Sequence, residues 1–143
     1  MSAEDFDQMK YTEAAWAVIA ALNQAGDYYS SSQIEAPLML DVLLNPTKHN
    51  AGADAEAAKR VATQVLQQSG VDVGALRSEL ETHMSKQPKI TGTNSQKVLG
   101  RDLPKVLDSA RTIQSVLGVS NMHAYFSFFL AFVFRGSQTF FLF

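Results

Sequence analysis

Apolar residues recur every three to four positions along this chain up to residue 118, which is the spacing of one face of an α-helix. This pattern predicts five helices, within residues 12–26, 37–44, 54–70, 72–88 and 102–118. Alternating β-branched residues, the pattern typical of a half-buried strand, do not occur before residue 119. The sequence therefore predicts an all-α fold.

Residues that favour helix ends flank several of these segments. Thr12 can cap the first helix through its hydroxyl group, and Gly26 is expected to end the same helix. Asp72 can cap the helix that follows it, with Val71 and Leu76 at the spacing of a hydrophobic staple. These local signals predict where the first and fourth helices begin.

The predicted helix at residues 37–44 is apolar on most sides. Its sequence, PLMLDVLL, has Asp41 as its one charged residue. A helix that is apolar all round is expected to be buried, so we expect this helix at the centre of the fold. We interpret Asp41 as the polar edge of the helix; the alternative is a buried functional acid.

Length and composition limit the classes of function. At 143 residues the chain is expected to form one domain, and its net charge of −2 argues against a nucleic-acid-binding face. It has no cysteine, which excludes disulfides and thiolate chemistry. Residues 1–10 are acidic and lack an apolar run, so neither a secretory signal nor a transit peptide is predicted, and we expect a cytoplasmic protein.

Motifs typical of catalysis or metal binding are absent from the sequence. It has no GxxxxGK[ST] phosphate loop, no HExxH motif and no EF-hand loop, so no enzyme activity, cofactor or metal is predicted. Its three histidines, His49, His83 and His123, are widely spaced, and we expect them to face solvent on a loop and at helix ends. The remaining class of function is recognition of another molecule.

Several segments occur in an order that is found in a known family. They are YTEAAWAVIAAL, QIEAPLMLDVLLN, SGVDVGALRSEL, QPKITGT and DLPKVLDSA. Together they resemble the N-terminal domain of the Clp/Hsp100 AAA+ chaperones, over about residues 11–118. The QPKITG segment and the DLPKVL helix start are more similar to the disaggregase branch of that family than to the branch that partners proteases.

The resemblance implies a domain built as a pseudo-repeat of two four-helix units. The first repeat would span residues 11–86, a linker would follow at 87–101, and the second repeat would begin at 102–118. Residues 1–10 would form an N-terminal arm, and residues 119–143 an atypical Phe-rich tail. In this division the first repeat is complete and the second is incomplete.

The resemblance also implies a function. The family domain is a non-catalytic module that offers a hydrophobic groove to exposed apolar segments of unfolded or aggregated polypeptides, which AAA+ motor modules then process. The resemblance places Leu107 and Phe126 at groove-lining positions and matches Thr12 to a family threonine that is tied to function. The residues alone allow simpler interpretations, in which Leu107 belongs to the core and Thr12 is a helix cap. A stand-alone adaptor or interaction protein is the alternative function.

Residues 119–143 differ in composition from the rest of the chain and contain eight of its nine phenylalanines. A membrane span needs about 20 apolar residues, whereas Arg135 interrupts this segment, so membrane association is expected to be weak at most. The segment could instead be a sixth helix, with Phe126, Phe129 and Val133 on one face. The interpretation that we favour is translation of non-coding sequence past an exon end, which would make the chain a truncated gene-model product.

Overall fold

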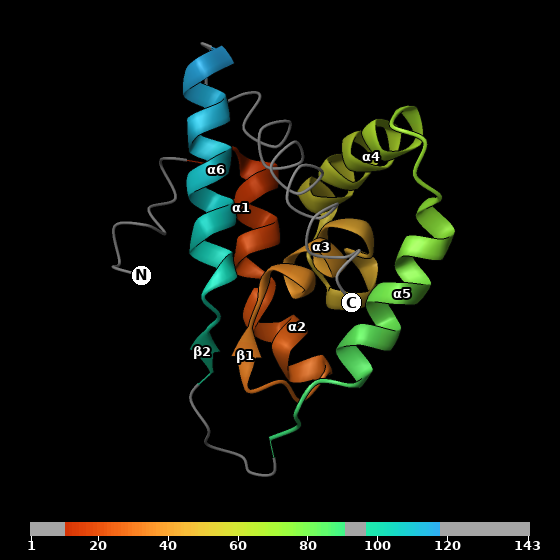
Figure 1. Ribbon diagram of the computed structural model, residues 1–143, viewed down its shortest axis with the longest axis vertical. Helices are drawn as coiled ribbons and strands as arrows, with labels where there is room; N and C mark the ends of the chain where they lie inside the picture. Colours follow the sequence, from red (N-terminus) through yellow and green to blue (C-terminus); the bar gives the residue numbers. More distant parts are fainter. Residues whose placement is uncertain (1–10, 91–96, 118–143) are drawn as a thin grey trace.

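The computed structural model describes residues 11–90 and 97–117, and this part of the chain is mainly helical (Figure 1). This architecture confirms the predicted all-α fold. The Phe-rich tail, with Phe126 and His123, lies outside the described residues. The elements in order are α1 (Glu13–Ala20), α2 (Leu22–Tyr28), β1 (Gln33–Ile34), α3 (Ala36–Leu44), the 3₁₀-helix η3 (Thr47–His49), α4 (Ala53–Gln68), α5 (Val73–Ser85), β2 (Val98–Leu99) and α6 (Asp102–Leu117).

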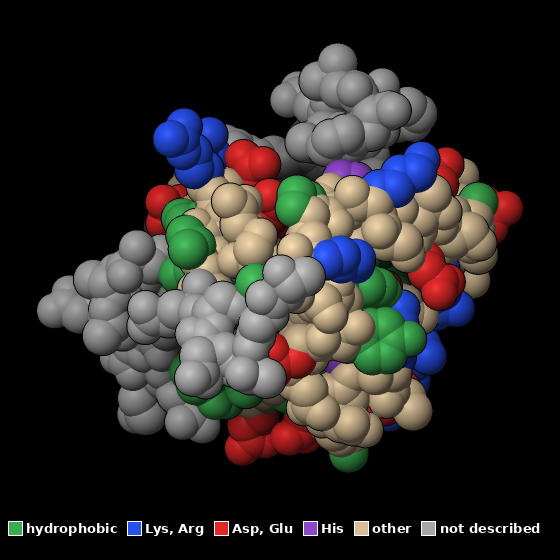
Figure 2. All heavy atoms as spheres, turned by 90° about the horizontal axis from the view of Figure 1, so that it is seen from below, with side chains coloured by type: hydrophobic (Ala, Val, Ile, Leu, Met, Phe, Trp, Pro, Cys, Tyr) green, Lys and Arg blue, Asp and Glu red, His purple; other side chains and the backbone are tan. Residues whose placement is uncertain are grey.

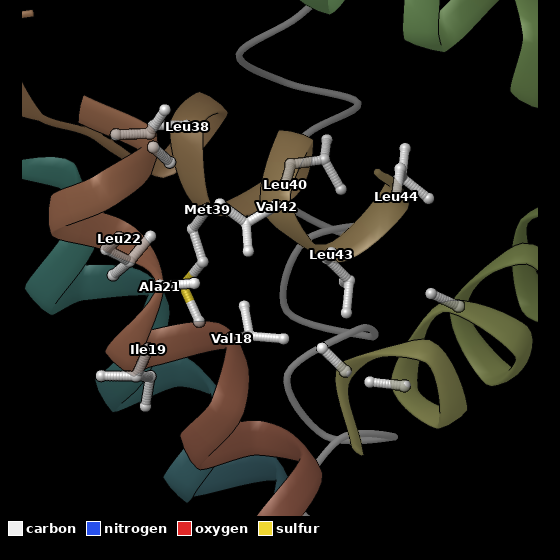
Figure 3. Close-up of a cluster of buried hydrophobic side chains, with 14 of the residues drawn as sticks. Val18, Ile19, Ala21, Leu22, Leu38, Met39, Leu40, Val42, Leu43 and Leu44 are labelled. Carbon is white, nitrogen blue, oxygen red and sulfur yellow. The ribbon is translucent and has the colours of Figure 1, made fainter. Parts of the chain in front are cut away.

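The central helix is α3, as its apolar sequence predicts. It contacts α1, α2, α4, α5 and α6, and every residue from Leu38 to Leu44 is buried. Figure 3 shows the Met39 side chain extending toward Val18 and Ala21 of the neighbouring segment. Burying one large apolar side chain contributes about 1.5–3 kcal/mol, so α3 supplies a large share of the free energy of folding.

The first predicted helix is divided into two shorter ones. α1 ends at Ala20 and α2 begins at Leu22, with Ala21 between them at φ −80° and ψ −9°. The predicted cap is confirmed, because the Thr12 hydroxyl accepts a hydrogen bond from the Ala15 N–H at 3.2 Å. The start of this segment therefore follows its local signal, whereas the break within it does not.

The prediction that Gly26 ends this helical segment is wrong. α2 continues to Tyr28, and Gly26 lies buried within it. A Cβ atom added at Gly26 would lie 2.9 Å from both Cδ and Cε of Lys97, which is closer than Cβ contacts normally come. Gly26 therefore allows a close approach between α2 and the later segment that carries Lys97.

The junction between α4 and α5 follows the predicted signals. Gly70 adopts φ +81°, and the N–H of Val71 donates to the carbonyl of Leu66 at 3.0 Å, which closes the end of α4. The Asp72 side chain accepts a backbone N–H in the first turn of α5. Val71 and Leu76 are both half-buried against the core, as the predicted staple requires.

A short parallel strand pair departs from the prediction of no strand before residue 119. β1 pairs with β2, with Gln33 opposite Val98 and Ile34 opposite Leu99. Strands of two residues are too short to produce an alternating pattern, so the sequence could not reveal them. The pair fastens the predicted linker, residues 87–101, to the segment that follows α2 and so positions the start of α6 (Figure 1).

Candidate functional site

The structure places two of the three predicted substrate-binding residues. Thr12 is half-buried, and its hydroxyl group is engaged as the cap of α1. Leu107, on α6, is 3% exposed and belongs to the hydrophobic core together with Leu103 and Val106. Phe126 lies outside the described residues. Thr12 and Leu107 therefore do not form one exposed apolar surface in this structure, and their role in binding stays a prediction.

A buried carboxylate is the most unusual polar feature of the described residues. Asp41 is 0% exposed, which corrects the prediction that it forms a polar edge of its helix. The hydroxyl of Tyr29 donates to Asp41 Oδ2 at 2.8 Å, and the side-chain amide of Asn45 donates to Oδ1 at 2.9 Å. His49 Nε2 lies 2.7 Å from Oδ2. Both carboxylate oxygens are thus hydrogen-bonded, which compensates for their removal from water.

Two lysines approach the same cluster from outside. Lys48 Nζ lies 3.5 Å from Asp41 Oδ2, donates a hydrogen bond to the Tyr29 hydroxyl and lies 4.8 Å from the centre of the Tyr29 ring. Lys89 Nζ donates to the backbone carbonyl of Tyr29 at 2.6 Å. We call Tyr29, Asp41, Asn45, Lys48 and His49 the Asp41 cluster. It joins the end of α2, the helix α3 and the 3₁₀-helix η3.

The histidine of this cluster also corrects a prediction. His49 was expected to face solvent, but it is 1% exposed, because the 3₁₀-helix turns its ring inward toward Asp41. Its Nδ1 atom is buried without a hydrogen-bond partner. His83, also expected to face solvent, is half-buried on α5, with its Nε2 atom 3.1 Å from Nε2 of Gln87. The two histidines therefore occupy separate sites.

The electrostatics of the cluster favour an ionised carboxylate. Burial raises the pKa of Asp41, but the hydrogen bonds from His49 and Tyr29, the charge of Lys48 and the hydrogen bond from Asn45 outweigh it, so the pKa lies below its ordinary value. Burial also raises the pKa of Tyr29, and the hydrogen bond to Asp41 and the charge of Asp41 raise it further. At neutral pH, Asp41 is therefore an ionised carboxylate that accepts a hydrogen bond from the neutral Tyr29 hydroxyl.

A carboxylate, an imidazole, a phenol and an ammonium group also occur together in acid–base catalysis, but here they are directed at one another. Asp41 and His49 are closed to solvent, so a substrate has no direct access to either group. No group of three or more metal-ligating side chains occurs among residues 11–90 and 97–117. The arrangement supports a role in holding three segments together.

Part of the Asp41 cluster can be recognised in the sequence from the spacing of its residues. Asp41, Asn45 and His49 follow one another at intervals of four residues, which places Asp41 and Asn45 on the same side of α3 and its C-cap. The third lies just beyond the end of the helix. A single acid in an otherwise apolar helix, followed at this spacing by an amide and a histidine, favours a buried and partnered carboxylate. Tyr29 could not be found in this way, because only the packing of α2 on α3 brings it there.

Exposed apolar side chains are few among those that the structure describes. The large ones are Tyr28, 58% exposed at the end of α2, and Val98, 61% exposed on β2. Figure 2 views the end of the molecule that carries these elements; outside the grey residues, its hydrophobic side chains form separate areas among polar and charged groups. No described helix is long and apolar enough to cross a membrane.

The sequence of this chain matches a known family. The model of the Clp repeat (R) N-terminal domain matches residues 10–124. The chain belongs to this family. The match confirms the resemblance seen in the sequence, and it extends beyond the last described residue of α6 into the Phe-rich segment.

Curated relatives of this Clp repeat domain are chaperones. Chaperone protein ClpB 2 of Synechocystis sp. is 27% identical over 112 residues, which are 78% of this chain and 12% of the relative. Chaperone protein ClpB 1 of Parasynechococcus marenigrum is 30% identical over 111 residues, again 78% of this chain and 12% of the relative. The chloroplastic ClpB2 of Oryza sativa is 26% identical over 113 residues, or 79% of this chain and 10% of the relative. The chain thus corresponds to an N-terminal domain of a Clp/Hsp100 chaperone and spans a small part of such a protein.

Proposed function

We propose that this chain is the substrate-recognition domain of a Clp/Hsp100-type disaggregase and that it binds exposed apolar segments of unfolded or aggregated polypeptides. The observation that carries the proposal is the family match over residues 10–124, together with relatives that are named chaperones. The AAA+ motor modules of the full-length chaperone are the second partner. In this proposal the chain itself is not catalytic, and a domain without a phosphate loop would depend on those modules for ATP hydrolysis.

The first test is direct binding of an unfolded polypeptide. Fluorescein-labelled casein, which lacks a stable fold, is titrated with the chain, and fluorescence anisotropy measures complex formation. We expect saturable binding that an excess of unlabelled casein reverses and that folded, disulfide-intact lysozyme does not compete for. Absence of binding by the folded chain would refute the recognition function.

Leu107 requires a test that separates packing from binding, because its side chain is buried. Leu107→Ala is compared with Leu103→Ala, one turn earlier on the same helix and 0% exposed. Each truncation should lower the free energy of unfolding by about 2–5 kcal/mol. Circular dichroism and urea denaturation establish conditions in which both variants are folded.

The two variants should then differ in binding. If Leu107 lines a groove that opens to a client, Leu107→Ala weakens casein binding more than Leu103→Ala does at the same fraction of folded protein. Equal effects on binding would assign Leu107 to the core alone. In that case the client-binding surface lies elsewhere on the domain, and the recognition function itself is still decided by the anisotropy of the unaltered chain.

A further inference from the structure

Asp41 differs in burial from the other acidic side chains in residues 11–90 and 97–117. Within this part of the chain it is the one carboxylate that is fully buried. Its hydrogen-bond partners come from two stretches of the chain: Tyr29 from the end of α2, and Asn45 and His49 from the residues that follow α3. A change in Asp41 therefore acts on α3, which carries it, and on both of these stretches together.

The connection between α3 and α4, residues 45–52, depends on these side chains for its attachment to α2. The backbone N–H groups of His49 and Ala51 donate to the carbonyl of Pro46, at 3.2 and 3.0 Å, so these bonds lie within the connection itself. Asn50 and Gly52 adopt φ +52° and +91°, so the backbone turns sharply. The polar links from the connection to α2 pass through Asp41 and Tyr29.

The charges around the cluster are unbalanced once Asp41 is neutral. Lys48 and His49 face Asp41 from η3, and Lys89, from the segment after α5, lies with its Nζ 5.7 Å from the centre of the Tyr29 ring. An acidic group on α5, Glu81, also acts on Tyr29 through its charge. A protonated Asp41 would lose its ion pair with Lys48 and could no longer accept every hydrogen bond that it accepts now.

We propose that the Asp41 cluster is an acid-sensitive latch, which holds the connection of residues 45–52 against α2 and releases it locally when Asp41 is protonated. The ring contacts of the exposed Tyr28 would be released with it, because His49 lies edge-on to Tyr28 with the ring centroids 5.4 Å apart. The latch acts on the conformation of the domain and is independent of the proposed client binding.

The direction of the pH effect follows from the electrostatics described above. The pKa of Asp41 is lowered in the folded state, so the charge contributes stability at every pH above the ordinary value of 3.8. That contribution is lost as the pH falls through the folded-state pKa. The latch is closed at neutral pH and opens in acid.

Amide hydrogen exchange of the 143-residue chain, followed by NMR from neutral pH to about pH 3 and corrected for intrinsic rates, measures the release. We expect protection of the Asn50 and Ala51 amides to fall by about tenfold or more, the equivalent of one charge-assisted hydrogen bond. Amides within α1 and α4 should keep their protection over the same range. Loss of protection in all helices at one pH, or no loss in residues 45–52, would overturn the proposal.

Two variants test whether Asp41 is the group responsible. Asp41→Asn should show reduced protection of the connection already at neutral pH, with no further change in acid. Asp102→Asn is the matched control, because Asp102 is an exposed carboxylate on α6, 3.9 Å from Lys105, and should behave as the unaltered chain. If Asp41→Asn does not fold, Tyr29→Phe serves instead: removing its hydrogen bond raises the pKa of Asp41, so release should move to higher pH. An unchanged release pH in Tyr29→Phe would contradict the latch.

Discussion

Gly26 and Lys97 offer a quantitative test of how the linker packs on the first helices. A Cβ atom at Gly26 would lie 2.9 Å from Cδ and Cε of Lys97, whereas its next neighbour, Cδ2 of Leu38, would be 4.0 Å away, at an ordinary contact distance. The Lys97 side chain is 15% exposed and forms an ion pair with Asp27. The obstacle to a larger residue at Gly26 is therefore the Lys97 side chain alone.

Gly26→Ala is expected to change the free energy of unfolding differently in the unaltered chain and in a Lys97→Ala variant. Replacing glycine by alanine inside a helix gains about 0.8–1 kcal/mol from backbone preference. In the unaltered chain, Gly26→Ala must displace the Lys97 stem, which loses its packing on α2 and an ion pair worth about 0–1 kcal/mol at such an exposed aspartate. The net change there should be close to zero or destabilising. In a Lys97→Ala background the obstacle is absent, so Gly26→Ala should stabilise the domain by most of that helix gain.

Urea denaturation of the four proteins in this double-mutant cycle measures the coupling. We expect a coupling free energy of about 0.5–1 kcal/mol, with no change in the slope of the unfolding free energy against urea. Equal stabilisation by Gly26→Ala in both backgrounds would refute the reasoning, because Lys97 would then not occupy the space above Gly26. A large loss in both would show that Leu38 or the backbone is the real obstacle.

Further predictions concern the caps, the core and the Asp41 cluster. Thr12→Ala and the matched Asp72→Ala each remove a helix cap and should each lower the free energy of unfolding by about 1 kcal/mol; a larger loss of casein binding in Thr12→Ala, measured on folded protein, would indicate a role beyond the cap. Leu80 is 0% exposed on α5, and Leu80→Ala should cost about 2–5 kcal/mol, seen as a lower thermal midpoint. Tyr29→Phe removes a hydrogen bond to a buried carboxylate and should cost about 1.5–3 kcal/mol at neutral pH. Because that bond is to the charged form of Asp41, variant and unaltered chain should converge in stability as the pH falls below the ordinary carboxylate range, and urea denaturation at several pH values checks this.

Local features of the fold were predictable because their causes lie within a few residues. Thr12 and Asp72 cap helices through backbone groups three positions away, and Gly70 closes α4 through its own positive φ. The central position of α3 was equally readable, because a helix that is apolar on most sides has to be surrounded. These predictions need no knowledge of residues that are distant in the sequence.

Two of the wrong interpretations, those of Gly26 and Asp41, have a common physical reason. In a helical pattern, a glycine usually marks a helix end and a single acid usually marks a polar edge, and the sequence favours these interpretations for Gly26 and Asp41. The actual environment of Gly26 is created by Lys97, which is brought there by the β1–β2 pair. That of Asp41 is created by Tyr29 and His49. In each case tertiary packing overrides the local preference.

The candidate site was readable from the sequence only in part. The apolar stripe of α6 indicates a core position for Leu107, whereas the family resemblance implies a groove-lining one; the structure places the side chain in the core with 3% exposure. A stripe of apolar residues shows which face of a helix is covered, but not whether the cover is this domain or a bound polypeptide. The family match identifies the class of domain, and binding measurements on the variants above decide the role of the residue.

The attachment of the linker to α2 has a consequence for the kinetics of folding. Asp27 and Lys97 are 70 residues apart in the chain, and closing so long a loop costs chain entropy before any contact compensates for it. We therefore expect the helices between them to pack first, and the ion pair and the β1–β2 pair to form after the rate-limiting step. Contacts that are absent from the transition state slow unfolding and leave the folding rate almost unchanged. The linker would thus determine how long a folded molecule persists, while the helices around α3 determine how quickly it forms.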